Sequence, residues 1–401
     1  MQTSQNLSQE ERAIDQARRW AAELTELRRW FHRHPETSFH ETGTAAKIRA
    51  ELTAAGIPFQ TVGETGTVGV IMGSRPGPTV GLRADIDALE VQELNDFPYR
   101  SETPGLMHAC GHDSHMAALL MAARILQQGR DRLAGTVKLV FQPGEEVGSG
   151  AAGILQSGLV DDVSAFFGLH ATPSLRTGQV SIREGAVMAG SNFIRITLRG
   201  KGGHAATPHR ARDAVVAGSA VVMALQSIVS RETAPVVPAV VTIGMFRAGT
   251  RGNIIADRAE LTGTARVTSE TERARVADAV RRVVAGTASA YGVEAEIKCE
   301  RATGIVSNSA ELVPVVRRAA RAVVSETGLV TLPVCLTTDD FYQYRKIAPA
   351  FYALVGVSGG TAETEPAPLH SGAFCLDEEA LPIEAALHVE FVRQFLAGAD
   401  G

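Results

Sequence analysis

Cysteine is scarce in this sequence, and basic residues do not outnumber acidic ones. Its four cysteines lie far apart, at positions 110, 299, 335 and 375, and none belongs to a CxxC pair. Disulfide frameworks are typical of small secreted domains, so this spacing in a chain of 401 residues favours reduced thiols. The formal net charge is −5 and Lys and Arg form no cluster, which argues against a nucleic-acid partner.

Long apolar runs and a leader pattern are missing as well. The longest apolar stretch, residues 214–229, is interrupted by Ser219, Gln226 and Ser227. It is too short to cross a membrane, so it predicts a buried helix. Residues 1–24 are polar and charged, without the basic start and apolar core of a signal peptide. We therefore expect a soluble, cytoplasmic protein with no membrane partner.

The remaining composition is that of a large globular protein. Hydrophobic residues make up 45% and charged residues 21% of the chain, and its length predicts two or three domains. Apolar strands alternate with helices in the first half. This alternation predicts an α/β domain whose mainly parallel sheet is covered on both faces. The predicted helices are 10–33, 44–55, 114–128 and 151–157, and the predicted strands are 67–72, 79–83, 136–141 and 165–169.

The pattern changes near residue 191. The next elements read strand, helix, strand, strand, helix, strand, at 193–199, 213–230, 239–246, 258–267, 269–290 and 294–301. This order predicts a ferredoxin-like α+β unit inserted into the first domain. A helix at 310–328, a strand at 350–355 and a helix at 376–396 would complete the first sheet. The predicted domains are therefore 1–187 and 302–401, which together form one domain, and the insertion 188–301.

Three predicted strands end in residues that can bind metal. Asp85 and Asp87 follow the first strand, Glu145 and Glu146 follow the second after a Pro-Gly pair, and His170 follows the third. Ligands of open α/β sheets bind beyond the carboxyl ends of the strands, so these side chains could meet at one site. The Pro-Gly pair would stop the strand and turn the two glutamates out of the sheet.

Cysteine and histidine gather just before the helix at 114–128. Cys110 and His112 are two residues apart and would point the same way in extended backbone. A thiolate and an imidazole together suit zinc or a similar metal. With His370 added, the candidates suffice for two metal ions. Of the adjacent glutamates, one could bind metal while the other accepts a proton from a metal-activated water and passes it to a leaving nitrogen.

A series of motifs in one order resembles the M20 metallopeptidase family, in its branch of aminoacylases, hippurate hydrolases and auxin-conjugate amidohydrolases. The resemblance covers about residues 28–395. The motifs are FHRHPE at 31–36, LRADIDAL at 82–89, HACGHD at 108–113, FQPGEE at 141–146, GGHAA at 202–206, NII at 253–255 and GTAR at 263–266.

The resemblance implies a zinc-peptidase-like catalytic domain with an inserted lid and dimerisation domain. It implies hydrolysis of the amide bond of N-acyl amino acids, and a homodimer or higher homo-oligomer formed through the lid. Two divalent ions (zinc, manganese, cobalt or nickel) would be held by Cys110, His112, Glu146, His170 and His370. Glu145 would be the general base and acid. His204 would polarise the carbonyl, and Asn253 and Arg266 would hold the oxyanion or the substrate carboxylate. From the residues alone, Asp87 could orient a metal ligand or cap a loop.

The sequence departs from the family pattern at Glu90, Gly144, Ala256 and residues 337–341, and none of these changes removes a ligand or the base. Three other functions remain open. A carboxypeptidase or dipeptidase would use the same site on true peptides. A thiol enzyme would use Cys110 as the nucleophile, and would be indifferent to chelators. A metal carrier would bind metal without turnover, but it would not need Glu145 beside Glu146.

Overall fold

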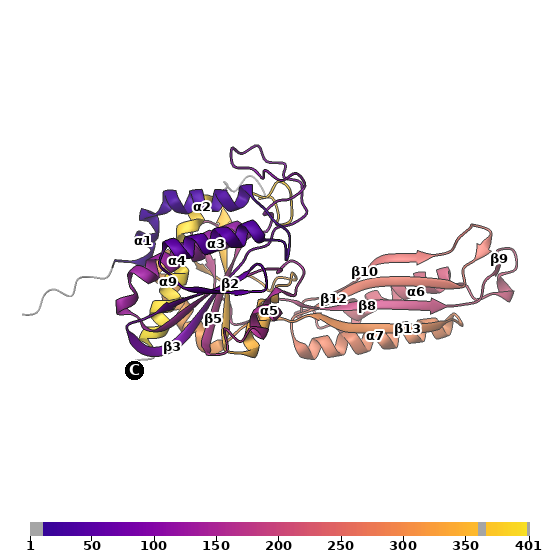
Figure 1. The fold of residues 1–401 in the computed structure, drawn as a ribbon. Helices are drawn as coiled ribbons and strands as arrows, with labels where there is room; N and C mark the ends of the chain where they lie inside the picture. Colours follow the sequence, from indigo (N-terminus) through magenta and orange to yellow (C-terminus); the bar gives the residue numbers. More distant parts are fainter. Residues whose placement is uncertain (1–10, 360–365, 399–401) are drawn as a thin grey trace, which may run out of the picture. The chain divides into compact units, whose positions relative to one another are not determined.

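The computed structural model describes residues 11–359 and 366–398 (Figure 1). The chain forms two compact units. Unit 1 comprises the described parts of Met1–Gly185, Ser307–Leu332 and Asp340–Gly401, and unit 2 comprises Ala186–Val306 and Pro333–Asp339. The expected insertion, 188–301, lies inside unit 2, and the second segment of unit 2 was not anticipated. The leader prediction and the predicted start of the first helix concern residues 1–10, outside the described residues.

Unit 1 is built on an eight-stranded sheet in the order β1-β2-β4-β3-β5-β16-β6-β15. Its four central strands, β4, β3, β5 and β16, run parallel, whereas β1, β2 and the β16–β6 pair are antiparallel. The prediction of a mainly parallel sheet is thus confirmed. The strands are β1 (Phe59–Val62), β2 (Gly66–Met72), β3 (Arg75–Asp85), β4 (Ala134–Gln142), β5 (Val163–Arg176), β6 (Val180–Ser181), β15 (Leu329–Val330) and β16 (Ala350–Ser358).

Helices cover both faces of this sheet. On one face, α4 and α9 contact the central strands, and the other long helices pack around them. The second face carries α5 and the short 3-10 helix Asp340–Lys346, with Phe341 and Tyr344 packed on Phe166 and Tyr352. The helices are α1 (Ala13–Arg19), α2 (Ala21–Arg33), α3 (Thr42–Ala54), α4 (His112–Gln128), α5 (Gly150–Gln156), α8 (Val313–Val324) and α9 (Leu381–Ala397).

Two predicted helices of unit 1 differ from the structure. The expected helix at 10–33 is divided into α1 and α2 at Trp20, whose φ of −100° and ψ of 14° interrupt the helical backbone. The expected helix at 310–328 is shorter. A 3-10 turn precedes α8, and Ser325, with φ 66° and ψ 177°, ends it before β15.

Unit 2 contains a four-stranded antiparallel sheet in the order β10-β12-β8-β13, with α6 and α7 packed on it (Figure 1). This is the strand order of a ferredoxin-like fold, as the element sequence predicted. The elements are β8 (Gly190–Arg199), α6 (Ala214–Ser227), β10 (Ala239–Ala248), β12 (Arg258–Val267), α7 (Glu270–Ala290) and β13 (Glu294–Thr303). Two small sheets pair β9 (Gly203–His204) with β11 (Ile254–Ile255), and β7 (Gly185–Met188) with β14 (Val306–Asn308).

Helix α6 is less buried than its apolar sequence predicted. Ala217, Val221 and Leu225 face the core of unit 2, but Val216 and Met223 are exposed. With the π-helical turn that follows α6, the segment Ala214–Glu232 is long and apolar enough by length and composition alone to cross a membrane. Because core helices of soluble proteins pass the same test, this is weak evidence for a span, and the helix uses one face to pack on its own sheet.

Candidate metal centre

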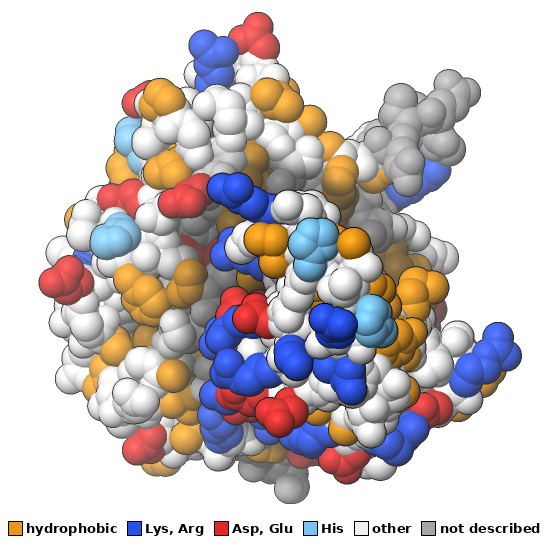
Figure 2. Space-filling model, turned by 90° about the vertical axis from the view of Figure 1, so that its right-hand side faces the viewer, with side chains coloured by type: hydrophobic (Ala, Val, Ile, Leu, Met, Phe, Trp, Pro, Cys, Tyr) orange, Lys and Arg blue, Asp and Glu red, His pale blue; other side chains and the backbone are white. Residues whose placement is uncertain are grey.

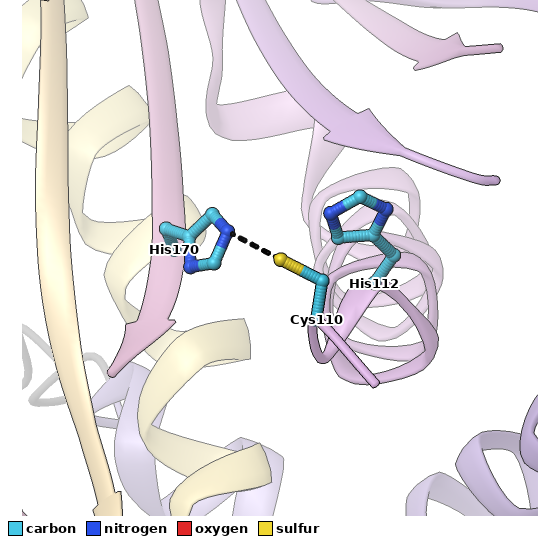
Figure 3. A group of neighbouring side chains, drawn as sticks. All are labelled: Cys110, His112 and His170. Atoms are coloured by element: carbon cyan, nitrogen blue, oxygen red, sulfur yellow. Dashed lines mark hydrogen bonds between the residues drawn. The ribbon is translucent and has the colours of Figure 1, made fainter. Parts of the chain in front are cut away.

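Five predicted metal ligands lie together in unit 1. The ligand atoms of Cys110, His112 and His170 lie within 4.8 Å of one another, and so do those of Cys110, Glu146 and His370. The Cys110 Sγ atom is 3.4 Å from His170 Nε2, and His370 Nε2 is 3.5 Å from Glu146 Oε1 (Figure 3 shows the first group). Cys110 belongs to both groups, so one thiolate between two ions would suit this arrangement.

The local backbone around Cys110 differs from the expected extended strand. Gly111 has a φ of +86° and His112 is the first residue of α4, so Cys110 and His112 flank a turn. Glycine suits this left-handed conformation because it has no Cβ atom to clash with the backbone. His170 was expected just after a strand, but it lies inside β5, because β16 keeps pairing with β5 beyond it. Both side chains nevertheless reach the cluster.

Hydrogen bonds fix which atoms of the histidines face the cluster. The carbonyl of Asp87 accepts the Nδ1–H of His112 at 2.8 Å, and the carbonyl of Ala171 accepts the Nδ1–H of His170 at 2.7 Å. A carbonyl oxygen can only accept, so in each neutral ring Nε2 carries the lone pair. Both lone pairs are therefore directed to the cluster, as metal-binding imidazoles require.

Two polar atoms of the cluster are buried without a hydrogen-bond partner: His112 Nε2 and Glu146 Oε1. Buried polar atoms without partners are rare because their desolvation is costly. Cations bonded to these atoms would remove that cost, and the donor set of one sulfur, three imidazoles and one carboxylate suits borderline divalent metals. The residues therefore fit a metal centre.

The electrostatics of Cys110 favour the same interpretation. Burial raises the pKa of the Cys110 thiol well above its ordinary value. A reactive cysteine nucleophile needs a lowered pKa, which this environment does not provide. A bound cation would displace the thiol proton, so the site favours a metal-ligating cysteine over a nucleophilic one.

Asp87 contacts two of the candidate ligands. Its carbonyl orients His112, and its carboxylate accepts the backbone N–H of Glu146 at 3.0 Å and the hydroxyl of Ser38 at 2.6 Å. Burial opposes ionisation of this carboxyl, but the hydrogen bonds from His112 and Ser38 lower the pKa of Asp87 below its ordinary value. An ionised Asp87 thus holds the turn that carries Glu146.

Glu145 is buried at the start of the turn after β4, and one of its carboxylate oxygens lies within 4.8 Å of the ligand atoms of His112 and Glu146. The Pro-Gly pair ends β4 at Gln142, as predicted, and Gly144 adopts a φ of +65°. Adjacent glutamates are therefore both presented to the cluster. One can bind a cation while the other stays within reach of a water molecule bound there.

Gly144 is one of the departures from the family pattern, and its surroundings explain the glycine. A Cβ at this position would lie 2.4 Å from the ring of Phe39, and the backbone is left-handed. We expect Gly144→Ala to lower the free energy of unfolding by about 1–3 kcal/mol, measured by urea denaturation. Gly153→Ala is the matched control. Its Cβ would meet nothing within 4 Å on helix α5, so it should stabilise by up to about 1 kcal/mol. Equal effects of the two changes would contradict this explanation.

Asp85 and His115 also belong to the site but were not among the predicted ligands. Asp85 Oδ1 lies 2.6 Å from His115 Nδ1, and Asp85 Oδ2 lies 3.6 Å from His112 Nε2. Asp85 had been noted only as a residue at a strand end, and His115 had not been singled out. The signal that could have singled it out is its spacing of three from His112, which places both rings on one face of α4.

The three remaining predicted site residues, His204, Asn253 and Arg266, lie in unit 2. His204 is an exposed residue of β9, and its Nδ1 accepts the N–H of Ala206 at 3.0 Å, which leaves Nε2 outward. Asn253 is exposed next to β11. Arg266 in β12 donates through Nη1 to the carbonyl of Leu336 at 2.7 Å. The structure describes these residues separately from unit 1, so their catalytic roles stay predictions.

Comparison with known proteins agrees with this geometry. Residues 81–394 match peptidase family M20/M25/M40. The chain belongs to this family. It is 38% identical over 369 residues to the N-acetylcysteine deacetylase of Bacillus subtilis (strain 168), covering 92% of this chain and 95% of the relative.

Two further similarities concern a plant hydrolase and a solved structure. The chain is 37% identical over 375 residues to the IAA-amino acid hydrolase ILR1-like 4 of Arabidopsis thaliana, covering 92% of this chain and 85% of the relative. Its fold is similar to the crystal structure of the Bacillus subtilis YXEP protein, described as a dinuclear metal-binding peptidase of the M20 family. That match has a TM-score of 0.83 and 35% identity, and covers 95% of this chain and 99% of the other. The resemblance seen in the motifs is thus confirmed, including its amidohydrolase branch.

Proposed function

We propose that this protein is a dinuclear metal-dependent amidohydrolase that cleaves N-acyl amino acids to a carboxylic acid and an amino acid. The observation that carries the proposal is the sharing of Cys110 by two three-ligand groups, with Glu145 beside them. The deacetylase and the auxin-conjugate hydrolase among its relatives support the substrate class.

One ion would be held by Cys110, His112 and His170, and a second by Cys110, Glu146 and His370. When bound, these ions would polarise the amide carbonyl and lower the pKa of a water molecule. Zinc, manganese, cobalt and nickel all suit this donor set.

Glu145 performs the proton transfers in this mechanism. Its carboxylate takes a proton from the attacking water as the water adds to the acyl carbonyl. It then delivers that proton to the amide nitrogen as the C–N bond breaks. Burial of Glu145 beside the cluster keeps the carboxylate close to the reacting atoms and away from bulk water. His204 donates to the oxyanion that forms on the carbonyl oxygen, in line with its outward Nε2.

Arg266 of the lid, which is unit 2, would bind the substrate carboxylate. Asn253 lies beside His204 beyond the opposite end of β12, so both would act on the oxyanion from the lid of a partner subunit, as the family resemblance implies. Basic side chains gather at the β9 end of unit 2, where Lys and Arg surround histidine (Figure 2). The cations around β9 and β11 include Lys201, Arg210, Arg247 and Arg251, all exposed. A positively charged surface attracts an anionic substrate. We also propose that unit 2 forms the homo-oligomer contact, since the exposed Val216 and Met223 of α6 and Met245 and Phe246 of edge strand β10 offer an apolar surface.

Arg266 provides a direct test of carboxylate recognition. We expect Arg266→Ala to raise KM for N-acetyl-methionine about 10- to 100-fold, because a bidentate charged contact is lost. With N-acetyl-methionine carboxamide, which lacks the charge, wild type and variant should have the same KM, while metal content stays unchanged. An equal rise for both substrates would show that Arg266 only supports the fold through Leu336.

A peptidase is the second candidate function, favoured by the similarity to the YXEP protein, a dinuclear metal-binding peptidase. Kinetics on N-acetyl, N-benzoyl and indole-acetyl amino acids beside dipeptides separates the two. The proposed function predicts a higher kcat/KM for at least one N-acyl amino acid than for every dipeptide. The reverse order would make the protein a dipeptidase or carboxypeptidase using the same centre.

A further inference from the structure

A series of hydrogen bonds supports His170. It begins where strand β5 continues beyond the end of its pairing with β3. The last residue of β5 that pairs with β3 is Gly168, opposite Arg83. Three residues further on, the backbone N–H of Ala171 has no β3 residue beside it. The imidazole of His115 takes the place of a strand carbonyl and accepts this N–H at Nε2, at 2.9 Å.

These contacts determine the proton positions on His115. A backbone N–H can only donate, so Nε2 of His115 must carry a lone pair, and the ring proton is on Nδ1. That proton is donated to Asp85 Oδ1 at 2.6 Å. The other oxygen of Asp85 accepts from Arg83 Nη1 at 2.5 Å. Arg83, Asp85 and His115 are all buried, so water does not compete for these bonds.

The series of hydrogen bonds ends on a candidate metal ligand. Ala171, whose N–H is bound by His115, offers its carbonyl to His170 Nδ1 at 2.7 Å. The same His115 ring lies 4.9 Å from the His170 ring and 5.5 Å from the His112 ring, centroid to centroid. His115 therefore holds the backbone that orients His170 and packs against two of the imidazoles of the centre.

We propose that His115, held by Asp85, is a positioning residue that aims His170 at one of the two metal ions. This inference rests on the proposed function, because His170 is a ligand only in that account. Its basis is that β5 has no β3 residue beside Ala171, so without His115 the N–H of Ala171 would lack its acceptor on that side and the His170 ring would be less firmly oriented. Asp85 could instead contact the metal itself, since its Oδ2 lies 3.6 Å from His112 Nε2, and the test separates this alternative.

The test compares two replacements of similar shape, His115→Gln and His115→Met. Glutamine can accept the N–H of Ala171 through Oε1, whereas methionine offers only a weak acceptor. Metal content is read by mass spectrometry, affinity by chelator competition, and ligand geometry by the visible spectrum of the cobalt-loaded protein. We expect His115→Met to bind one of the two ions about 10- to 100-fold more weakly and to change the cobalt spectrum. His115→Gln should stay within about threefold of wild type.

His388→Met is the matched control. His388 is another fully buried histidine, packed 5.4 Å from the Phe167 ring, and both of its ring nitrogens lack a hydrogen-bond partner. This variant should keep two ions and the wild-type cobalt spectrum.

Two results would overturn the positioning role. One is His115→Met with two tightly bound ions and an unchanged spectrum. The other is a His115→Gln variant that binds one ion more weakly than wild type. This result can be obtained even if His115→Met does not fold. Asp85→Asn should match the methionine variant in losing affinity for one ion. If His115→Met keeps both ions and only Asp85→Asn loses one, then Asp85 is the ligand. A wild-type protein that binds no metal would instead overturn the proposed function.

Discussion

A Glu145→Gln variant should bind the same two metal ions as the wild type and hydrolyse N-acetyl amino acids about 10²- to 10⁴-fold more slowly, the usual contribution of a general acid–base group. The amide is nearly the same size as the carboxylate, so the turn after β4 should keep its shape. It cannot accept the proton of the attacking water, and that step should limit kcat. KM should change little, because Glu145 is not required to bind the ground state.

The measurement is kcat on N-acetyl-methionine together with the metal content of the same preparation. Glu64→Gln is the matched control, since Glu64 is an exposed residue in the turn before β2, and it should keep full activity. A metal-loaded Glu145→Gln with wild-type kcat would remove Glu145 from the proton transfers. A variant that loses its metal would instead assign Glu145 to the ligand set.

Replacement of Cys110 should have the broadest effect on the centre. Because Cys110 belongs to both three-ligand groups, Cys110→Ala should weaken both ions and lower activity by at least about 10³-fold at limiting metal. Cys299→Ala is the control, since Cys299 is also buried but lies in the core of unit 2. Cys299→Ala should leave the metal content and kcat unchanged. A Cys110→Ala protein with both ions tightly bound would contradict the shared-thiolate arrangement.

The same thiol makes metal binding depend on pH. Burial raises the pKa of Cys110, so the metal-free protein holds a protonated thiol near neutral pH. Binding must release that proton, and affinity should therefore rise by about tenfold per pH unit between pH 6 and 8 from this group alone. Chelator competition at several pH values measures the slope. Cys110→Ala should have a shallower slope, and an equal slope would show that the thiol proton is not displaced.

Much of the architecture could be predicted from local patterns. Strand β16 is a nearly continuous apolar run, and the buried middle segments of β3, β4 and β5 are largely apolar, which is typical of parallel strands buried on both faces. The order of elements in unit 2 was sufficient for its ferredoxin-like sheet. What was missed depends on tertiary contacts. The two-residue strands β6 and β15 have no pattern of their own, and β5 extends past His170 only because β16 stays beside it.

The candidate ligands could also be predicted, because their residue types and motifs carry the signal by themselves. The supporting role of His115 could not be predicted. Nothing in the sequence shows that β5 extends beyond its pairing with β3. The role of His115 as the acceptor for the N–H of Ala171 is therefore visible only in the structure. The prediction that Cys110 and His112 share an extended segment was wrong because glycine at 111 permits a left-handed turn.

The measurement that tests the central claim most directly is hydrolysis of N-acyl amino acids before and after metal removal. Purified protein is treated with a chelator, its metal content is read by mass spectrometry, and zinc, manganese or cobalt is then added back. The account predicts that activity disappears with the metal and returns as about two ions per chain are restored. Activity that survives complete metal removal would contradict the account and make Cys110 a candidate nucleophile.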